Sequence, residues 1–231
     1  PVELVRDVRP AAEVRRIVGR RPPAVRDGVK VEEVTDMYGK FVVQPLERGY
    51  GVTLGNSFRR ILLSSLRGVA ISAIKIDGVQ HEFSTIEGVT EDVADIILNL
   101  KGVRFRQTVD APDATVSFVL DGPGEWTAAD IAGATSDYEV LNEEHHIATL
   151  DKGSHLDIEL RIGSGRGYVP AEENKHADDP IGVIAIDSVY TPIQNVKYNV
   201  TPTRVGQKID FERLTIEIET DGSVTAEEAI T

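Results

Sequence analysis

The sequence contains no cysteine among its 231 residues. This absence excludes disulfide bonds, catalysis by a thiolate and zinc sites built on cysteine ligands. No apolar run approaches the length of about 20 residues that a membrane-spanning helix needs, and the arginine-rich N-terminus is not followed by the apolar segment of a signal peptide. We therefore expect a cytoplasmic protein that has no contact with a membrane.

Positive charge is also scarce, because the chain has a net charge of −13 and a pI near 4.8. An acidic chain repels phosphate backbones, so independent binding to nucleic acid requires a local concentration of basic residues. Residues 1–26 provide one, with seven arginines against three acidic side chains, and they run into the linker RRPPAVRDG. We interpret this segment as a disordered or loosely helical basic leader, with a nucleic-acid-binding arm as the alternative.

The apolar residues favour a globular fold built mainly from strands. They make up 41% of the chain, which is a usual share for a folded domain. Alternation with a period of two predicts strands in TVSFVL, HLDIELRI, IGVIAIDSV, NVKYNV and RLTIEIET. KFVVQPL begins another strand, which Pro45 is expected to interrupt. Because strands and helices do not alternate regularly, the pattern predicts an α+β fold rather than a doubly wound α/β sheet.

The segment EDVADIILNLKG has the periodicity of an amphipathic helix. Its apolar residues recur at positions i, i+3, i+4 and i+7, namely Val93, Ile96, Ile97 and Leu100. Gly102 follows the last of them, and glycine at this place is a common helix stop. The pattern predicts a short helix that buries one face.

A second helix is predicted over residues 53–66. Its core-facing stripe is formed by Leu54, Phe58, Ile61 and Leu62. Arg60 falls far from that stripe, and Leu63 lies on yet another side of the helix. We interpret this helix as one that also contacts a partner protein, because the planar guanidinium group of arginine is well suited to interfaces. A solvated arginine beside a peripheral core leucine is the alternative.

The glycines before this helix do not form a phosphate-binding loop. Gly49, Gly51 and Gly55 lack the spacing of a P-loop, and no Gly-Lys-Ser/Thr follows them. We expect at least one of the first two to adopt a positive φ where the chain turns from strand into helix. Gly55 lies inside the helix, where glycine costs about 1 kcal/mol relative to alanine. A close approach to another backbone is the expected compensation.

No group of residues in the sequence forms a credible catalytic constellation. His145 and His146 would point to opposite faces of a strand, so a solvated loop is favoured over a metal site. The segment GSGRGYVPAEEN is rich in glycine, but its spacing is not that of a dinucleotide-binding loop, and Pro170 stands where a helix should begin. An autonomous enzyme that uses the GRGYVP loop and nearby acidic residues remains the alternative to a binding protein.

The most informative stretch is LERGYGVTLGNSFRRILLSSLRGVAISAIKIDGVQHEFSTIEGVTEDVADIILNLKG. It resembles the N-terminal domain of the α subunit of bacterial RNA polymerase. The resemblance continues through WTAADI, HIATLDKG, GRGYVPAEEN, IDSVYTPIQNVKYNV and TRVGQKIDFERLTIEIETDGSVTAEEAI, and it covers roughly residues 36–231. The family often has Arg where this chain has Lys208, and it often has Asp or Lys where this chain has Glu212. Residues 1–26 have no counterpart in this resemblance.

The resemblance implies two intercalated domains and a role in assembly. A dimerisation domain would combine residues 27–67 with residues 193–231, and a mostly-β domain, residues 68–192, would be inserted into it. In this family two α chains form a dimer on which the β and β′ subunits assemble for DNA-templated transcription, and the catalytic magnesium site belongs to β′. The implied protein is a homodimeric, non-catalytic subunit of a nucleotidyltransferase, without a cofactor or metal of its own, that meets DNA only through the assembled enzyme.

The resemblance also implies roles for individual residues. Arg60 matches the family arginine that supports binding of β, whereas Lys101 and Ile186 match positions linked to binding of β′. The helix over residues 53–66 corresponds to the dimer-contact helix of the family, with the interface residues Phe58, Leu62, Leu63 and Leu66. Two alternatives stay open: Lys101 closes a helix where the dipole favours a cation, and Ile186 is a core residue.

The C-terminal segment SVTAEEAIT predicts the start of another helix. Thr225 and Glu228 have the spacing of a capping box, in which each side chain satisfies a backbone N–H of the other residue. Because isolated helices shorter than about 12 residues are marginal in water, we expect at most one turn. In the family this helix continues and a linker leads to a DNA-binding C-terminal domain, so we interpret the chain as a fragment that lacks both.

Overall fold

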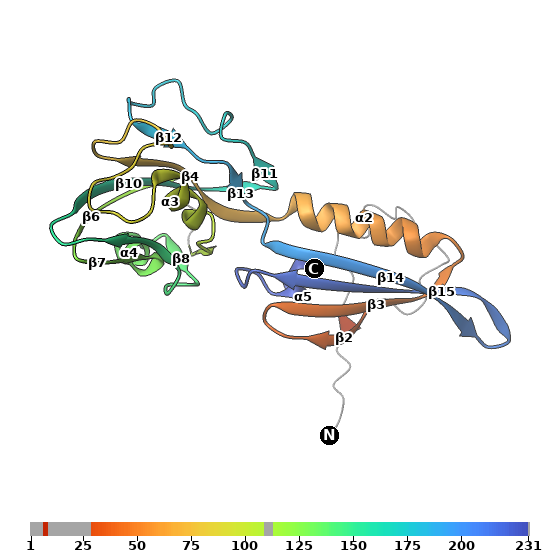
Figure 1. Cartoon of the computed structure of the whole chain (residues 1–231). Coiled ribbons are helices and arrows are strands. Elements are labelled where there is room, and N and C mark those ends of the chain that lie inside the picture. The colour runs from red at the N-terminus through yellow and green to blue at the C-terminus, as the bar shows by residue number, and fades with distance from the viewer. Residues whose placement is uncertain (1–6, 9–28, 109–112, 231) are drawn as a thin grey trace. The chain divides into compact units, whose positions relative to one another are not determined.

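The computed structural model describes residues 7–8, 29–108 and 113–230 (Figure 1). By contacts the chain divides into unit 1, which combines Pro1–Leu66 with Pro192–Thr231, and unit 2, which is Arg67–Thr191. Both units contain helices and more strands than helices, which is compatible with the α+β prediction. Apart from the strand at residues 7–8, the predicted basic leader lies outside the described residues.

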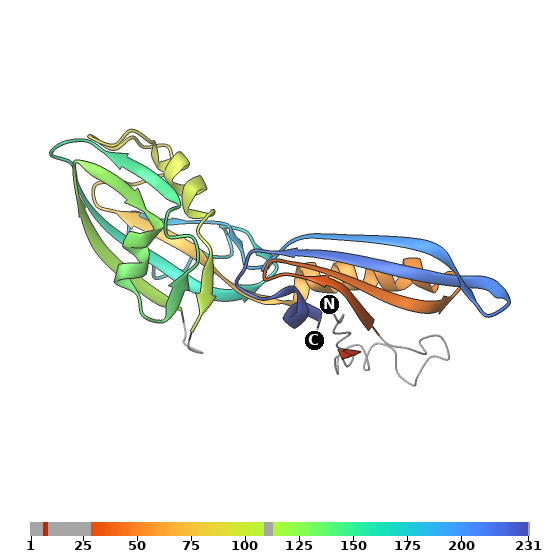
Figure 2. The same ribbon diagram turned by 90° about the horizontal axis from the view of Figure 1, so that it is seen from below.

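Unit 1 is a five-stranded antiparallel sheet with a long helix lying along it (Figures 1 and 2). In sheet order its strands are β1 (Asp7–Val8), β2 (Val29–Val34), β3 (Tyr38–Glu47), β15 (Lys208–Thr220) and β14 (Ile193–Val205). The long helix is α2 (Tyr50–Ser65), which packs mainly over β14 and β15, and the short helix α5 (Ala226–Ile230) packs against β15 and β3.

One face of this sheet is apolar and forms the core of unit 1. On β15, Leu214, Ile216 and Ile218 are buried at alternate positions, as the period-two pattern predicts. Leu62 of α2 belongs to the same buried cluster, as do Ala226 and Ile230 of α5. Burying a leucine or isoleucine side chain contributes about 1.5–3 kcal/mol to folding, so this shared cluster fastens both helices to one face of the sheet.

The prediction that Pro45 interrupts its strand is wrong, because β3 continues through it to Glu47. Val43 pairs with Leu214 and Leu46 pairs with Glu212, so two residues of β3 lie opposite a single residue of β15. Such a bulge tolerates a residue that has no N–H to donate. On the other side of β3, the described pairing with β2 reaches only as far as Val43.

The capping box predicted near the C-terminus is confirmed. The backbone N–H of Thr225 donates to Glu228 Oε2 over 2.9 Å, and the backbone N–H of Glu228 donates to Thr225 Oγ1 over 3.2 Å. Helix α5 follows at once and is five residues long, slightly more than the single turn of about 3.6 residues that the sequence predicts as the maximum. The two reciprocal bonds satisfy donors that the first turn of a helix leaves free.

Within its described residues, unit 2 combines one larger sheet with three small ones and two short helices (Figure 1). In sheet order the larger sheet holds β12 (Val183–Ala185), β4 (Arg67–Ile76), β10 (His155–Arg166) and β6 (Ala114–Asp121). The small sheets pair β11 (Tyr168–Val169) with β13 (Ser188–Val189), β5 (Phe105–Gln107) with β8 (Tyr138–Val140), and β7 (Gly124–Thr127) with β9 (His146–Leu150). The helices are α3 (Val93–Leu100) and α4 (Ala128–Ala134).

The core of unit 2 forms where helix α3 and the sheets bury their apolar faces. The predicted helix is confirmed as α3, and its buried residues are Val93, Ile96 and Leu100. They join the alternate buried positions of β10 and the fully buried ring of Trp126 in one cluster. Within the described ranges, no helix combines the length and the apolar character that crossing a bilayer requires.

Gly102 follows α3 as predicted, but its role is set by a neighbouring side chain. It is not among the glycines with a positive φ, so it is not a left-handed helix stop. A Cβ atom at this position would lie 2.5 Å from Nε2 of His145. The absence of a side chain therefore makes room for the histidine ring.

Candidate functional site

Helix α2 begins immediately after strand β3, and a glycine makes the turn between them. Gly49 has a φ of 89°, which confirms that one of the two leading glycines adopts a positive φ. Gly49 is also the N-cap residue, so it has no side chain with which to cap the helix, and the first turn contains no acidic residue. The exposed N–H groups at the start of α2 must therefore find a partner elsewhere in the chain.

That partner is the carboxylate of Glu212 on strand β15. The backbone N–H of Gly49 donates to Oε1 and the backbone N–H of Gly51 donates to Oε2, both over 2.9 Å. The hydrogen bond from Gly49, followed by that from Gly51, holds the pKa of the Glu212 carboxyl group below its usual value. Residue patterns did not reveal this contact, because the partners are more than 160 positions apart.

The inner face of α2 packs closely on the sheet of unit 1. A Cβ atom at Gly55 would lie 2.5 Å from the ring of Tyr198, so the close approach is to an aromatic side chain and not to another backbone. Leu62 is 3% exposed and belongs to the core of this unit. The other three predicted interface residues, Phe58, Leu63 and Leu66, are half-buried and pack against the same core, as does Leu54. Ile61, which periodicity assigned to the buried stripe, is half-buried but is not one of the side chains in this packing.

The outer face of α2 carries the exposed residues Val52, Asn56, Arg59 and Arg60. At about 100° per residue these four positions fall within one arc of the helix surface. Among the residues that the structure describes, neither arginine side chain has a hydrogen-bond or ion-pair partner. The predicted site residue Arg60 thus lies in solvent, on the side of the helix opposite to the glycine face.

The other two predicted site residues lie close together in unit 2. Lys101 at the end of α3 forms an ion pair and a hydrogen bond with Asp187, the residue that follows Ile186. The bond from Lys101 is the main reason why the pKa of Asp187 is lowered. Ile186 itself is 2% exposed and belongs to the core of unit 2, so what reaches the surface next to it is the Lys101–Asp187 pair, with about a third of each side chain exposed.

A buried asparagine holds this segment in place. Nδ2 of Asn174 donates to the carbonyl oxygen of Ile186 over 2.6 Å and to Oγ of Ser188 over 3.0 Å. Oγ of Ser188 in turn donates to the carbonyl oxygen of Ile71 on β4 over 2.9 Å. Asn174 belongs to the GSGRGYVPAEEN segment, which therefore supports the neighbourhood of Asp187. A motif search for phosphate-binding loops could not find this role.

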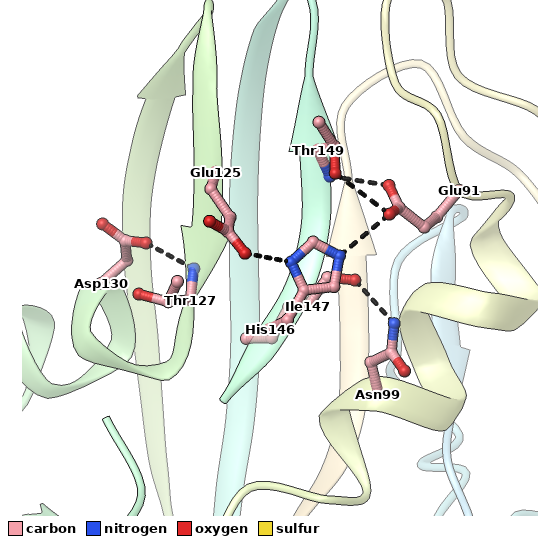
Figure 3. Close-up of polar contacts among 8 residues, drawn as sticks. All are labelled: Glu91, Asn99, Glu125, Thr127, Asp130, His146, Ile147 and Thr149. Carbon is pink, nitrogen blue, oxygen red and sulfur yellow. Dashed lines mark hydrogen bonds and ion pairs between the residues drawn. The ribbon is translucent and has the colours of Figure 1, made fainter. Parts of the chain in front are cut away.

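The two adjacent histidines have different partners, and the expectation of a solvated loop is only partly right, because His145 precedes strand β9 whereas His146 begins it. Figure 3 shows the partners of His146. His146 is the first residue of β9, and its ring lies between two carboxylates, with Nε2 2.9 Å from Glu91 and Nδ1 2.6 Å from Glu125. Nε2 of His145 lies 2.8 Å from the carbonyl oxygen of Asn99 on α3. Across residues 7–8, 29–108 and 113–230, no three histidine or acidic side chains are grouped so that they could hold a metal ion.

The contacts of His146 stabilise its protonated form. The hydrogen bond with Glu91, followed by that with Glu125, raises the pKa of the imidazole above its usual value. Burial alone would raise the pKa of Glu91, but hydrogen bonds from the backbone N–H of Thr149 and from His146 more than offset it, so this pKa is lowered. The cluster therefore links the segment before α3 to strands β7 and β9 by charge-assisted bonds.

The class of protein is defined by the sequence of unit 2. Residues 74–191 match the family described as the RNA polymerase Rpb3/RpoA insert domain, and the chain belongs to this family. More particularly, it is 65% identical over 205 residues to the DNA-directed RNA polymerase subunit alpha of Salinibacter ruber, and it is 57% identical over 204 residues to the protein of that name from Chloroherpeton thalassium. These matches cover 89% and 87% of the chain, and the chain spans 62% of the length of each relative.

Proposed function

We propose that the chain acts as the α subunit of a DNA-directed RNA polymerase, a non-catalytic platform on which the other subunits of this nucleotidyltransferase assemble. The observation that carries the proposal is the 65% identity over 89% of the chain to a relative of that name. The identity extends over both units, so it includes the helix with the exposed arginines as well as the family-defining insert. The chain would contact DNA only as part of the assembled enzyme.

Unit 1 is proposed as the dimerisation domain, into which unit 2 is inserted. Two copies would meet through α2, with Phe58, Leu63 and Leu66 as the contacting side chains. Their partial burial against the core of unit 1 leaves apolar surface for a partner. Leu62 is 3% exposed and would support this surface from beneath rather than touch the second copy.

Arg60 is proposed to bind the β subunit in one copy of the dimer. Its support is the exposed position on the outer face of α2 and a guanidinium group that has no partner within the described part of the chain. Such a group keeps all its donors for an interface, where arginine often contributes most of the binding free energy.

Lys101 and Ile186 are proposed to serve binding of the β′ subunit in the other copy. Because Ile186 is 2% exposed, its role would be to hold Asp187 at the surface rather than to touch β′. The Lys101–Asp187 pair, with about a third of each side chain exposed, would make the contact. Asp187→Asn and Lys101→Ala should then weaken β′ binding to a similar degree, and a loss confined to the lysine variant would assign the contact to Lys101 alone.

The proposal for Arg60 is tested by measuring the affinity of the purified chain for the cognate β subunit. Arg60→Ala should weaken binding to β by about 2 kcal/mol or more, which is the usual effect of losing an interface hot spot. The denaturant concentration at the midpoint of unfolding should stay close to that of the parent. Arg59→Ala is the matched comparison, because it makes the same charge change one position along the helix. Equal losses for both variants would indicate a general charge effect, and no loss for Arg60→Ala would refute the assignment.

A further inference from the structure

We propose that Glu212 is a positioning residue for partner binding: its carboxylate fixes the start of α2 on strand β15 and so sets the orientation of the outer face that carries Arg60. The part of this inference that concerns binding of a partner rests on the function proposed above. Glu212 touches no partner in this account, since its two oxygens accept the N–H groups of Gly49 and Gly51. Its effect would be transmitted by the helix.

The start of α2 depends on this one side chain. A helix leaves the N–H groups of its first turn without intrahelical acceptors, and the N-cap Gly49 makes no side-chain cap hydrogen bond. The carboxylate of Glu212 accepts hydrogen bonds from two of these N–H groups, those of Gly49 and Gly51. It also places a negative charge at the positive end of the helix dipole. Two bonds at 2.9 Å from the two oxygens of one carboxylate fix the direction of the first turn as well as its position.

The glycines of α2 are matched to this arrangement. A Cβ atom at Gly51 would lie 2.9 Å from Oε2 of Glu212 and 2.6 Å from Cγ1 of Val200 on β14. Any other residue at that position would therefore push the carboxylate or the helix away. Gly49 is needed for a different reason, because its φ of 89° is rarely adopted by residues with a side chain.

The position of Glu212 in the sheet makes it a firm anchor. It lies on β15 opposite Leu46 of β3 on one side and Pro202 of β14 on the other. Strand β15 is thus held from both sides at this point, next to the end of β3 where the chain leaves for α2. The hydrogen bonds from Gly49 and Gly51 lower the pKa of Glu212, so its carboxylate stays ionised to a lower pH than that of an ordinary glutamate.

The outer face begins within the turn that Glu212 fixes. Val52 is 56% exposed and belongs to the first turn, and Arg60 lies nine positions after Gly51, or about 14 Å along the helix at 1.5 Å per residue. The helix is held near its other end by the buried Leu62. The contact of Gly55 with Tyr198 and the burial of Leu62 would remain if the carboxylate were lost. The start of the helix would then be free to shift, and Val52 and Arg60 would move relative to the sheet as the helix axis tilts.

The test uses Glu212→Gln, which removes the charge at nearly constant shape, and Glu212→Asp, which keeps the charge on a shorter side chain. Asp210→Asn is the control, because it makes the same charge change at an exposed position two residues earlier on the same strand. In Glu212→Gln, amide hydrogen exchange at Gly49 and Gly51 should accelerate about 3- to 30-fold, as expected for loss of a helix cap. Affinity for the purified β subunit should fall within the same range, and Glu212→Asp should restore part of both.

A double-mutant cycle separates positioning from a general loss of stability. If Glu212 acts through Arg60, Glu212→Gln should weaken β binding much less in the Arg60→Ala background than in the parent. If amide exchange is unchanged in Glu212→Gln, Glu212 does not cap the helix. If exchange is faster but β binding is unchanged, or if the binding losses of Glu212→Gln and Arg60→Ala simply add in the double mutant, Glu212 does not position Arg60. A parent chain that does not bind β at all would refute the proposed function instead, and the exchange data would still decide whether Glu212 holds the helix.

Discussion

The helices of the two units are held by different means. Helix α3 of unit 2 is 8 residues long and buries three large apolar side chains, Val93, Ile96 and Leu100. Helix α2 of unit 1 is 16 residues long, yet its buried residues are Gly51, Gly55 and Leu62. A glycine face brings the backbone of α2 close to the strands but removes little apolar surface from water. The long helix therefore depends more on close approach and on its cap than on the burial of large side chains.

Cations in both units form ion pairs, among them Lys40 with Glu32 over 3.1 Å in unit 1, but the two adjacent arginines of α2 form none within the described residues. In unit 2, Lys75 pairs with Glu159 over 3.0 Å, Lys101 with Asp187, and Arg161 with Asp179, whose pKa is lowered chiefly by that arginine. In unit 1, the described residues offer no such partner to Arg59 or Arg60 on α2. Charges that are paired within a unit contribute to its internal order, whereas unpaired arginines keep their donors for a binding partner. The guanidinium groups of α2, which are free within the described residues, support the proposal, taken from the family resemblance, that Arg60 contacts β.

The largest expected effect concerns the core of unit 2. Leu160→Ala removes a side chain that is 0% exposed and should destabilise the unit by about 2–5 kcal/mol, through lost burial and the cavity left behind. The single tryptophan, Trp126, is also fully buried in this unit, so its fluorescence during denaturant unfolding reports on unit 2. Leu98→Ala on α3 is the control, since Leu98 is 61% exposed. Similar shifts for both variants would contradict the assigned core.

A smaller effect compares one helical glycine from each unit. Gly55→Ala should destabilise unit 1 by about 1–3 kcal/mol, because the new Cβ must displace the Tyr198 ring from 2.5 Å. Gly133→Ala in α4 meets no atom within 4 Å and should stabilise unit 2 by about 0.4–1 kcal/mol. Denaturant unfolding followed by circular dichroism measures both changes. The cost of Gly55→Ala should shrink in a Tyr198→Ala background, and an undiminished cost would mean that the ring is not the obstacle.

The smallest expected effect is a pH dependence in unit 2. A histidine with a raised folded-state pKa contributes stability that is fully present below the unfolded value of about 6.5 and is lost as pH rises through the folded value. Unfolding of the parent, followed through Trp126, should therefore become easier as pH rises through this window. His146→Gln should flatten the dependence, with a change of about 0.2–1 kcal/mol because its side chain is 39% exposed.

His155 provides the comparison for that experiment. Its pKa is also raised, by a hydrogen bond with Asp121, but the two side chains are 66% and 78% exposed. Solvent screens such a pair, so His155→Gln should leave the pH profile closer to that of the parent. If His155→Gln flattened the profile more than His146→Gln, the Glu91–His146–Glu125 cluster would not be its source.

Short-range patterns determined a large part of this structure. The apolar spacing of helix α3, the alternation along β10 and β15, the capping box of Thr225 and Glu228, and the positive φ at Gly49 all follow from residues a few positions apart. Backbone sterics and local hydrogen bonds act over that range, so the features that depend on them can be predicted from the sequence alone. Helical spacing set Arg60 apart from the buried stripe, but its role and the site residues Lys101 and Ile186 came from the family resemblance.

Tertiary structure decided which of these residues have partners. Glu212 reaches the start of α2 from 161 positions away, Tyr198 occupies the space beside Gly55, and Asn174 holds the segment before Asp187. Each contact depends on strands and loops that the fold brings together, and no periodicity encodes the distance between such partners. For the same reason the sequence marks Arg60 and Ile186 alike as candidates, whereas only the packed structure places one in solvent and the other in the core.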